Sequence, residues 1–212
     1  MKGFLFTVLT LVSIAFLAAF VPKQSKTPAV SAINSLQTPT KWTVDKSHSN
    51  VKFSVIHLVV SEMEGSFKMF DGSIEHSKAD MSDAKINFTV DVNSINTDNE
   101  NRDKHLKSDD FFNAEKFPSM TFVSTAFTPV GGNKYKLTGN LTIRDITKPV
   151  TFDVTFGGIA TSTRGDKAGF KAKTTINRFD YNLKWDRATE AGGLVVSKEV
   201  DVTVFVEMNK AK

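Results

Sequence analysis

Strict alternation of apolar and polar residues is the feature that most constrains this fold. Apolar side chains recur at every second position in five segments: residues 51–57, 86–92, 135–143, 150–156 and 200–208. Successive side chains of a strand point to opposite faces, so each segment has one apolar face to bury and one polar face to expose to solvent. One-sided burial of this kind is typical of antiparallel sheets rather than of parallel sheets covered on both faces.

Three weaker alternating segments bring the expected number of strands to about eight. They span residues 66–74, 121–127 and 170–176, and turn residues such as Asp71-Gly72 and Gly157-Gly158 fall between or within them. Closing these strands into a ring leaves no sheet edge unpaired. The sequence therefore predicts an all-β fold, an antiparallel β-barrel of about eight strands.

Two stretches depart from the period of two. Residues 97–107 predict a short helix with Asp98 or Asn99 as its N-cap, because both side chains can accept from the free amides of a first turn. Residues 177–183 predict a second helical turn. The expected barrel therefore carries one or two short helices and no separate helical domain.

The N-terminal region has a different composition from the alternating part. Lys2 is followed by an almost wholly apolar run to Val21, so residues 1–21 predict a signal peptide. The run is at the lower limit for spanning a bilayer, so an uncleaved anchor, associated with a membrane, is the alternative. Residues 22–40 contain three prolines and predict a flexible linker, and residues 41–212 the barrel domain. We therefore expect a periplasmic or otherwise exported protein.

Charge and cysteine content exclude several classes of function. The formal charge is +4, but Lys2, Lys23 and Lys26 precede the alternating part, which holds 24 basic and 23 acidic residues from position 41 onward. Nucleic-acid binding needs clustered basic residues, so we expect no nucleic-acid partner. The absence of cysteine excludes disulfides, a cysteine nucleophile and a lipid-anchored N-terminal cysteine.

Several separated motifs occur in an order that resembles the YceI-like family over about residues 41–208. The quoted stretches are Asp-Lys-Ser-His-Ser at 45–49, Arg-Asp-Lys-His-Leu at 102–106, Asp-Phe-Phe-Asn at 110–113, Thr-Lys-Pro-Val at 147–150 and Asn-Arg-Phe-Asp-Tyr at 177–181. The resemblance implies a lipocalin-like barrel, exported to the periplasm, that binds a polyisoprenoid or a similar amphiphilic lipid and needs no other cofactor. It also makes a homodimer plausible.

The alternation and an aromatic cluster after the predicted helix supply the candidate ligand-binding residues. They are Phe53, Val55, His57, Phe88, Val90, Phe112, Leu141, Phe152 and Val204. An eight-stranded barrel is just wide enough either to be filled by its own side chains or to hold one ligand. Period alone leaves these two alternatives open, and the family resemblance favours a cavity.

His57 has two interpretations, because alternation places it on the apolar face, where a buried imidazole needs a partner. It could meet a ligand head group, or it could pair with a backbone group, His48 or Ser49.

Arg102, Asp103 and His105 are interpreted as residues that pin the helix, and Arg178 and Asp180 as an ion pair with a structural role.

The favoured function is a carrier or store for a long-chain isoprenoid amphiphile, without catalytic residues and without a metal site. A hydrolase or isomerase using His57 with Asp103 or Asp180 is one alternative, and it requires a titratable pair within hydrogen-bond reach. A solid barrel that acts as an extracellular interaction module is another. A zinc site from His48, His57 and His105 is disfavoured, because their spacing contains no close pair.

Overall fold

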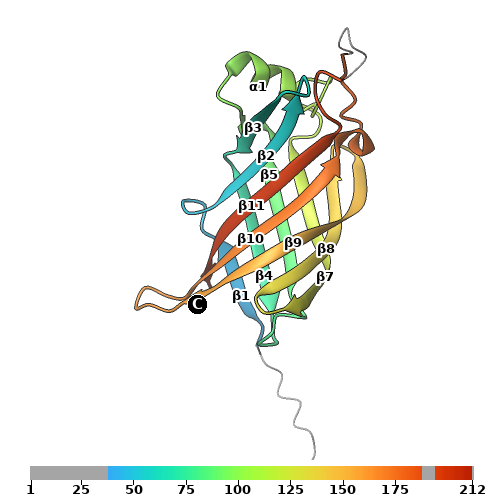
Figure 1. Cartoon of the computed structure of the whole chain (residues 1–212). Coiled ribbons are helices and arrows are strands. Elements are labelled where there is room, and N and C mark those ends of the chain that lie inside the picture. The colour runs from blue at the N-terminus through green and yellow to red at the C-terminus, as the bar shows by residue number, and fades with distance from the viewer. Residues whose placement is uncertain (1–37, 188–193, 212) are drawn as a thin grey trace, which may run out of the picture. The chain divides into compact units, whose positions relative to one another are not determined.

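The computed structural model describes residues 38–187 and 194–211. The predicted signal peptide and most of the predicted linker lie outside these residues. Within them the chain forms a ring of tilted antiparallel strands, with a short helix at one end (Figure 1). No helix in the described part of the chain combines the length and the apolar character needed to cross a bilayer.

Eight strands close the ring. In spatial order they are β1 (Thr40–Val44), β4 (Phe70–His76), β5 (Lys85–Asp91), β7 (Ser119–Gly131), β8 (Lys134–Ile143), β9 (Ile146–Ala160), β10 (Lys167–Asn177) and β11 (Glu199–Lys210). Each pairs antiparallel with the next, and β11 returns to pair with β1. The predicted all-β barrel of about eight antiparallel strands is confirmed.

Strand β11 has two partners on the same edge. Its last residues pair with β1, with Met208 opposite Val44, whereas its earlier residues pair with β2 (Asn50–His57), with Val204 opposite Val51. Strand β2 continues into β3 (Ser61–Phe67), and β3 pairs with the short β6 (Ile95–Asn96). A 3₁₀ turn, η1 (Val92–Ser94), links β5 to β6, so β2, β3 and β6 extend the wall at one end.

The prediction of a single strand at residues 66–74 is wrong. These residues contain the end of β3 and the start of β4. The turn falls at Lys68 and Met69, not at Asp71-Gly72. Gly72 lies inside β4, opposite Phe88 of β5, and a Cβ there would come within 2.5 Å of the Phe88 ring. Glycine at this position makes room for an aromatic ring and does not mark a turn.

The helical predictions are close to the structure. Helix α1 (Glu100–Lys107) begins after Asn99, whose side chain accepts from the Arg102 amide at 3.0 Å. The second predicted turn is a 3₁₀ helix, η2 (Arg178–Tyr181), capped in the same way by Asn177 on the Phe179 amide. Both caps satisfy amides that have no partner in a first helical turn.

The barrel interior is filled at the end that contains the turn between β7 and β8. Phe127 and Tyr135 stack there with ring centroids 4.4 Å apart, and Phe156 stacks on Phe170 at 5.0 Å. Met208 of β11 is almost completely buried in the same core. This packed end, here called the closed end, is opposite α1 in Figure 1.

Candidate functional site

A cavity of about 510 Å³ occupies the barrel toward α1. The volume lies within the usual range for small-molecule sites, about 300–1,000 Å³. Its wall is mainly aliphatic and aromatic. All nine residues that the sequence singles out line it: Phe53, Val55, His57, Phe88, Val90, Phe112, Leu141, Phe152 and Val204. The structure thus brings these residues to one cavity, while their contact with a ligand stays a prediction.

Glycines on neighbouring strands shape this wall. Gly65 pairs with Phe53 across β2 and β3, and a Cβ on Gly65 would overlap the Phe53 ring. A Cβ on Gly139 of β8 would likewise overlap Phe122 of β7. Each ring therefore lies back over the backbone of the next strand. This placement leaves room in the middle of the barrel that a ring projecting straight inward would fill.

The cavity reaches the barrel end through an irregular frame, here called the mouth. It is formed by α1, by residues 183–185 and by residues 195–196, and its lining includes Arg102, His105, Leu183, Trp185, Val195 and Val196. The His105 ring meets Trp185 edge-on with centroids 5.3 Å apart, and Phe111 lies 5.4 Å from Trp185. These contacts join α1 to the segment that faces it.

Arg178 holds together the two segments that face each other at the mouth. Its guanidinium is buried and donates to four backbone carbonyls, those of Leu183 at 2.5 Å, Trp185 at 2.8 Å, Val196 at 3.1 Å and Ser197 at 2.8 Å. Burial lowers the pKa of Arg178, yet an arginine stays charged at neutral pH. The predicted pairing with Asp180 is wrong, because these bonds go to the backbone.

Arg102 and Asp103 fix the start of α1, as predicted for a structural role. Arg102 Nε donates to Thr97 Oγ1 at 2.7 Å, and Arg102 Nη2 donates to the Thr97 carbonyl at 2.6 Å. The Asp103 carboxylate accepts from the Thr97 hydroxyl at 2.6 Å and from its amide at 2.9 Å. One threonine therefore ties both side chains to the segment that enters the helix.

His57 lines the cavity at the mouth end of β2, where its backbone bridges to Val196. The predicted pairing with His48 or Ser49 is wrong, because these residues precede the other end of an eight-residue strand, roughly 23 Å away. In the described residues, 38–187 and 194–211, no carboxylate hydrogen-bonds to the His57 ring. Asp103, one of its suggested catalytic partners, is engaged by Thr97.

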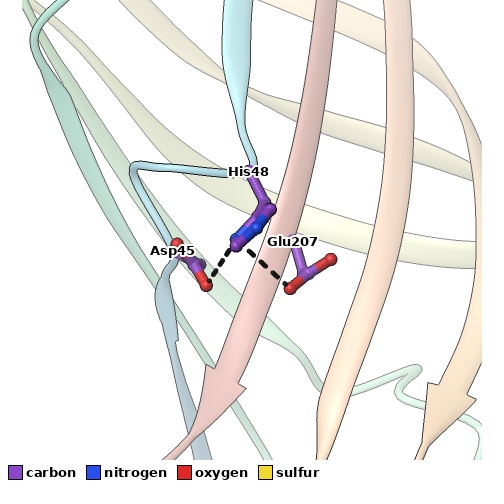
Figure 2. A group of neighbouring side chains, drawn as sticks. All are labelled: Asp45, His48 and Glu207. Atoms are coloured by element: carbon purple, nitrogen blue, oxygen red, sulfur yellow. Dashed lines mark hydrogen bonds and ion pairs between the residues drawn. The ribbon is translucent and has the colours of Figure 1, made fainter.

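The three histidines considered for zinc do not meet at one site. His57 and His105 line the cavity, whereas His48 lies beside Asp45 and Glu207 on the outside of the barrel (Figure 2). His48 Nδ1 is 3.1 Å from the Asp45 carboxylate and 3.8 Å from that of Glu207. Both carboxylates are already paired with the Lys167 ammonium, at 2.8 Å and 2.6 Å.

This seam cluster, Asp45, His48, Lys167 and Glu207, joins the ends of β1, β10 and β11. The Lys167 ammonium, together with bonds from Ser47 and His48, holds the pKa of Asp45 well below its usual range. The same two carboxylates raise the pKa of Lys167. Since the single Lys167 ammonium already engages both carboxylates, we interpret the cluster as a set of bonds that holds the barrel seam together.

Sequence reasoning missed most of the mouth. Leu183, Trp185, Val195 and Val196 line the cavity from segments without regular secondary structure. A period of two identifies the inner face of a strand and is silent about such segments. The available signal was the tryptophan itself, a large apolar side chain in an otherwise polar stretch.

An antiparallel barrel packed at one end and hollow toward the other, with an apolar wall, defines a lipocalin-like barrel with room for a ligand. Residues 42–208 match the model of the YceI-like domain. The chain belongs to the YceI-like family.

Relatives and solved structures agree with this membership. The chain is 38% identical over 172 residues to a UPF0312 protein of Staphylococcus aureus strain MSSA476, covering 80% of this chain and 98% of that protein. The crystal structure of BcnA from Burkholderia cenocepacia is similar with a TM-score of 0.67 and 28% identity, covering 77% and 98% of the two chains. The YceI protein of Campylobacter jejuni gives 0.64 at 33% identity, covering 80% and 97%.

A third solved structure shares the fold at low identity. It is a polyisoprenoid binding domain from Saccharophagus degradans, with a TM-score of 0.62 and 16% identity, covering 80% of this chain and 98% of that domain. At this identity the likeness shows a common barrel and nothing about which residues bind a ligand.

Proposed function

We propose that this protein is an exported, non-catalytic lipid carrier that holds a long-chain polyisoprenoid or a similar amphiphile inside its barrel. The observation that carries the proposal is the cavity of about 510 Å³ with its apolar wall. The polyisoprenoid binding recorded for the Saccharophagus degradans domain supports the choice of ligand class, as does membership of the YceI-like family.

Hydrophobic burial is sufficient for such binding. Burying one five-carbon isoprene unit contributes at most about 4 kcal/mol, at roughly 0.8 kcal/mol per carbon. The loss of freedom on association costs about 4–15 kcal/mol, so a few buried units offset it. No strong polar anchor is required, which suits a wall made mainly of aliphatic and aromatic side chains.

The two ends of the cavity favour one orientation of the ligand. The closed end is packed with apolar side chains, and the mouth carries polar side chains that include Arg102 and His105. An amphiphile would bury its chain toward the closed end and keep its head group at the mouth, where water and these side chains can hydrogen-bond to it.

The geometry gives no support to a hydrolase or isomerase that uses His57. General acid–base catalysis needs a titratable pair within hydrogen-bond reach, and His57 has no carboxylate partner among the described residues. Asp103 is held by Thr97 instead. A solid-core interaction module is also disfavoured, because only one end of the barrel is filled.

Export and assembly extend the proposal beyond the barrel. The apolar run from Phe4 to Val21 supports secretion, and cell fractionation with N-terminal sequencing of the exported form tests both export and cleavage. An uncleaved segment would keep the protein at the membrane. Light scattering of the purified protein tests the homodimer that the family resemblance suggests.

Mass spectrometry of an organic extract from natively purified protein tests the carrier directly. A polyprenyl species near one per chain is expected, with uptake restored after delipidation. Val204→Asp should abolish it, whereas Thr203→Asp, its neighbour outside the cavity lining, should not. Circular dichroism checks that both variants fold. An empty wild-type protein that also takes up no prenyl lipid would refute the proposal.

A further inference from the structure

The turn between β2 and β3 exposes three consecutive large apolar side chains. Leu58 is 43%, Val59 78% and Val60 85% exposed, and Val59 and Val60 are the most exposed large hydrophobic residues in the described part of the chain. Single exposed apolar residues are common, but a run of three at the tip of one turn is a patch.

The backbone of the apolar turn, residues 58–60, is held in an unusual conformation. Leu58 and Val59 have φ angles of 51° and 66°, a region that branched residues rarely adopt. Hydrogen bonds fix this shape, from the Leu58 amide to the Val195 carbonyl at 2.9 Å and from the Val60 amide to the His57 carbonyl at 3.2 Å. The apolar turn is thus an ordered display of side chains, at a backbone cost that glycine or asparagine would avoid.

The apolar turn is continuous with the cavity wall. His57 precedes it directly and lines the cavity, and Val195 and Val196, which bond to this part of the backbone, line it too. The exposed tip is therefore bonded directly to residues that line the cavity. In Figure 1 this end of β2 lies beside α1, at the end opposite the closed one.

Charges around the apolar turn have both signs. Glu62 follows it on β3, and Asp186 and Arg187 lie on the facing segment, where the Arg187 carbonyl accepts from the Val195 amide at 3.0 Å. A mixed surface of this kind attracts neither anionic nor cationic partners strongly. The attraction that the turn offers is therefore apolar.

We propose that the apolar turn inserts into a lipid surface and holds the mouth of the barrel against it. A stable interface between two protein copies buries at least about 1,200 Å², more than three side chains of one tip supply. A few apolar side chains suffice to enter the boundary between head groups and acyl chains. That docking would let a ligand pass between bilayer and cavity, a role that rests on the proposed lipid-carrier function.

Single-cysteine labelling tests the insertion in the full-length chain, which has no native cysteine. Val60→Cys carries a bimane label, and Val130→Cys, an exposed valine at the closed end, is the matched control. With neutral phosphatidylcholine vesicles, we expect the emission of the label at position 60 to shift to the blue and its quenching by iodide to fall at least twofold. Both changes should persist at high salt. The label at position 130 should show neither change. An N-terminal anchor would bring both labels to the vesicle alike.

Equal responses at both positions, or none at position 60, would overturn the insertion. A second variant tests its consequence. Val59→Asn keeps the left-handed backbone accessible and removes the apolar group. Transfer of a fluorescent polyprenol from vesicles should slow by about tenfold, since burying a valine favours the inserted state by at least that factor. Uptake from detergent solution should not change, and Val130→Asn should affect neither.

The two proposals fail in different ways. If the label at position 60 responds to vesicles but the wild-type protein takes up no polyprenol from either source, the carrier function is wrong and the docking stands. If uptake from detergent is normal but transfer from vesicles is the same in Val59→Asn and wild type, the docking role is wrong and the carrier function stands.

Discussion

Arg178 stabilises the mouth of the barrel through geometry that only an arginine offers. Its planar guanidinium reaches four carbonyls that belong to two facing segments. A lysine has a single charged nitrogen with three donors and cannot span these acceptors. The interaction therefore depends on the shape of the group as much as on its charge.

Arg178→Lys should lower the free energy of unfolding by about 2–4 kcal/mol, because buried carbonyls lose their partners and the buried charge is less well solvated. Urea denaturation measures the change. Arg164→Lys, at an exposed arginine, should change it by less than about 0.5 kcal/mol. Hydrogen exchange should also accelerate in residues 183–187 and 194–197. Unchanged stability of Arg178→Lys would show that these bonds do not hold the mouth.

Gly65 sets the position of the Phe53 ring, and thus part of the cavity shape. Because a Cβ would overlap that ring, Gly65→Ala should push Phe53 into the cavity. Overpacking of this kind destabilises by about 1–3 kcal/mol and should weaken binding of a bulky lipid more than of a short one. Gly165→Ala meets no atom but has a φ of 116°, so it reports backbone strain without overpacking. Titration with prenols of increasing length separates the two effects.

The seam cluster shows how side chains fasten strand β1 to the rest of the ring. Asp45 is the first residue after β1, and its amide donates to the Glu207 carbonyl of β11 at 2.8 Å. Lys167 of β10 bridges the two carboxylates. The pairing of β1 with β11 is short, so these side-chain bonds add to a seam that has few backbone bonds of its own.

The seam cluster gives the fold a defined pH dependence. The pKa of Asp45 is lowered from its ordinary value of 3.8, so the folded protein favours the ionised carboxylate. That contribution is complete well above pH 3.8 and is lost as the pH falls from 3.8 toward the lowered pKa. Asp45→Asn should therefore be less stable than wild type by about 2 kcal/mol at pH 7, and the difference should shrink below pH 4.

Urea unfolding between pH 3 and pH 7 measures this difference. Asp153→Asn removes a carboxylate from an exposed pair with Lys136 and should cost less than about 1 kcal/mol throughout. If Asp45→Asn matched wild type at pH 7, or if the gap widened toward acid, the seam cluster would not stabilise the folded state in this way.

The strands that the sequence predicted well are those whose pattern reflects local geometry. Alternation placed Phe53, Phe88 and Phe152 on one face, and all three line the cavity. The division into β3 and β4 was missed because Gly65 and Gly72 interrupt the apolar period there. Their meaning depends on rings from neighbouring strands, a tertiary relation that no local pattern contains.

The candidate site also has one part that the sequence predicts and one part that it does not. Its wall follows from strand alternation, whereas its mouth depends on irregular backbone that Arg178 organises through carbonyls. Every residue has a backbone carbonyl, so the sequence cannot show which carbonyls Arg178 binds. It suggested the Asp180 carboxylate as the partner of Arg178 instead. The choice between a filled and a hollow barrel also needed the packed structure, because the chain uses aromatic stacking to fill one end and leaves the other hollow.

At the scale of the whole molecule, a barrel that is hollow at one end lacks part of the packing that stabilises a protein interior. Side chains around an unfilled space lose contacts on one side. A bound lipid would supply those contacts in the folded state and would have no equivalent site in the unfolded chain. Ligand occupancy and fold stability are therefore coupled by mass action.

Removal of the bound lipid should lower the stability of the fold measurably. A ligand at 100 times its Kd stabilises by about 2.7 kcal/mol, which shifts the Tm of a protein this size by roughly 6–10 °C. Differential scanning calorimetry of the native, delipidated and relipidated protein should show a fall and a recovery of that size. Val204→Asp should show neither, and Thr203→Asp should behave as wild type. A delipidated protein with the native Tm would mean that the cavity is stable empty and that any lipid in it binds too weakly to couple to folding.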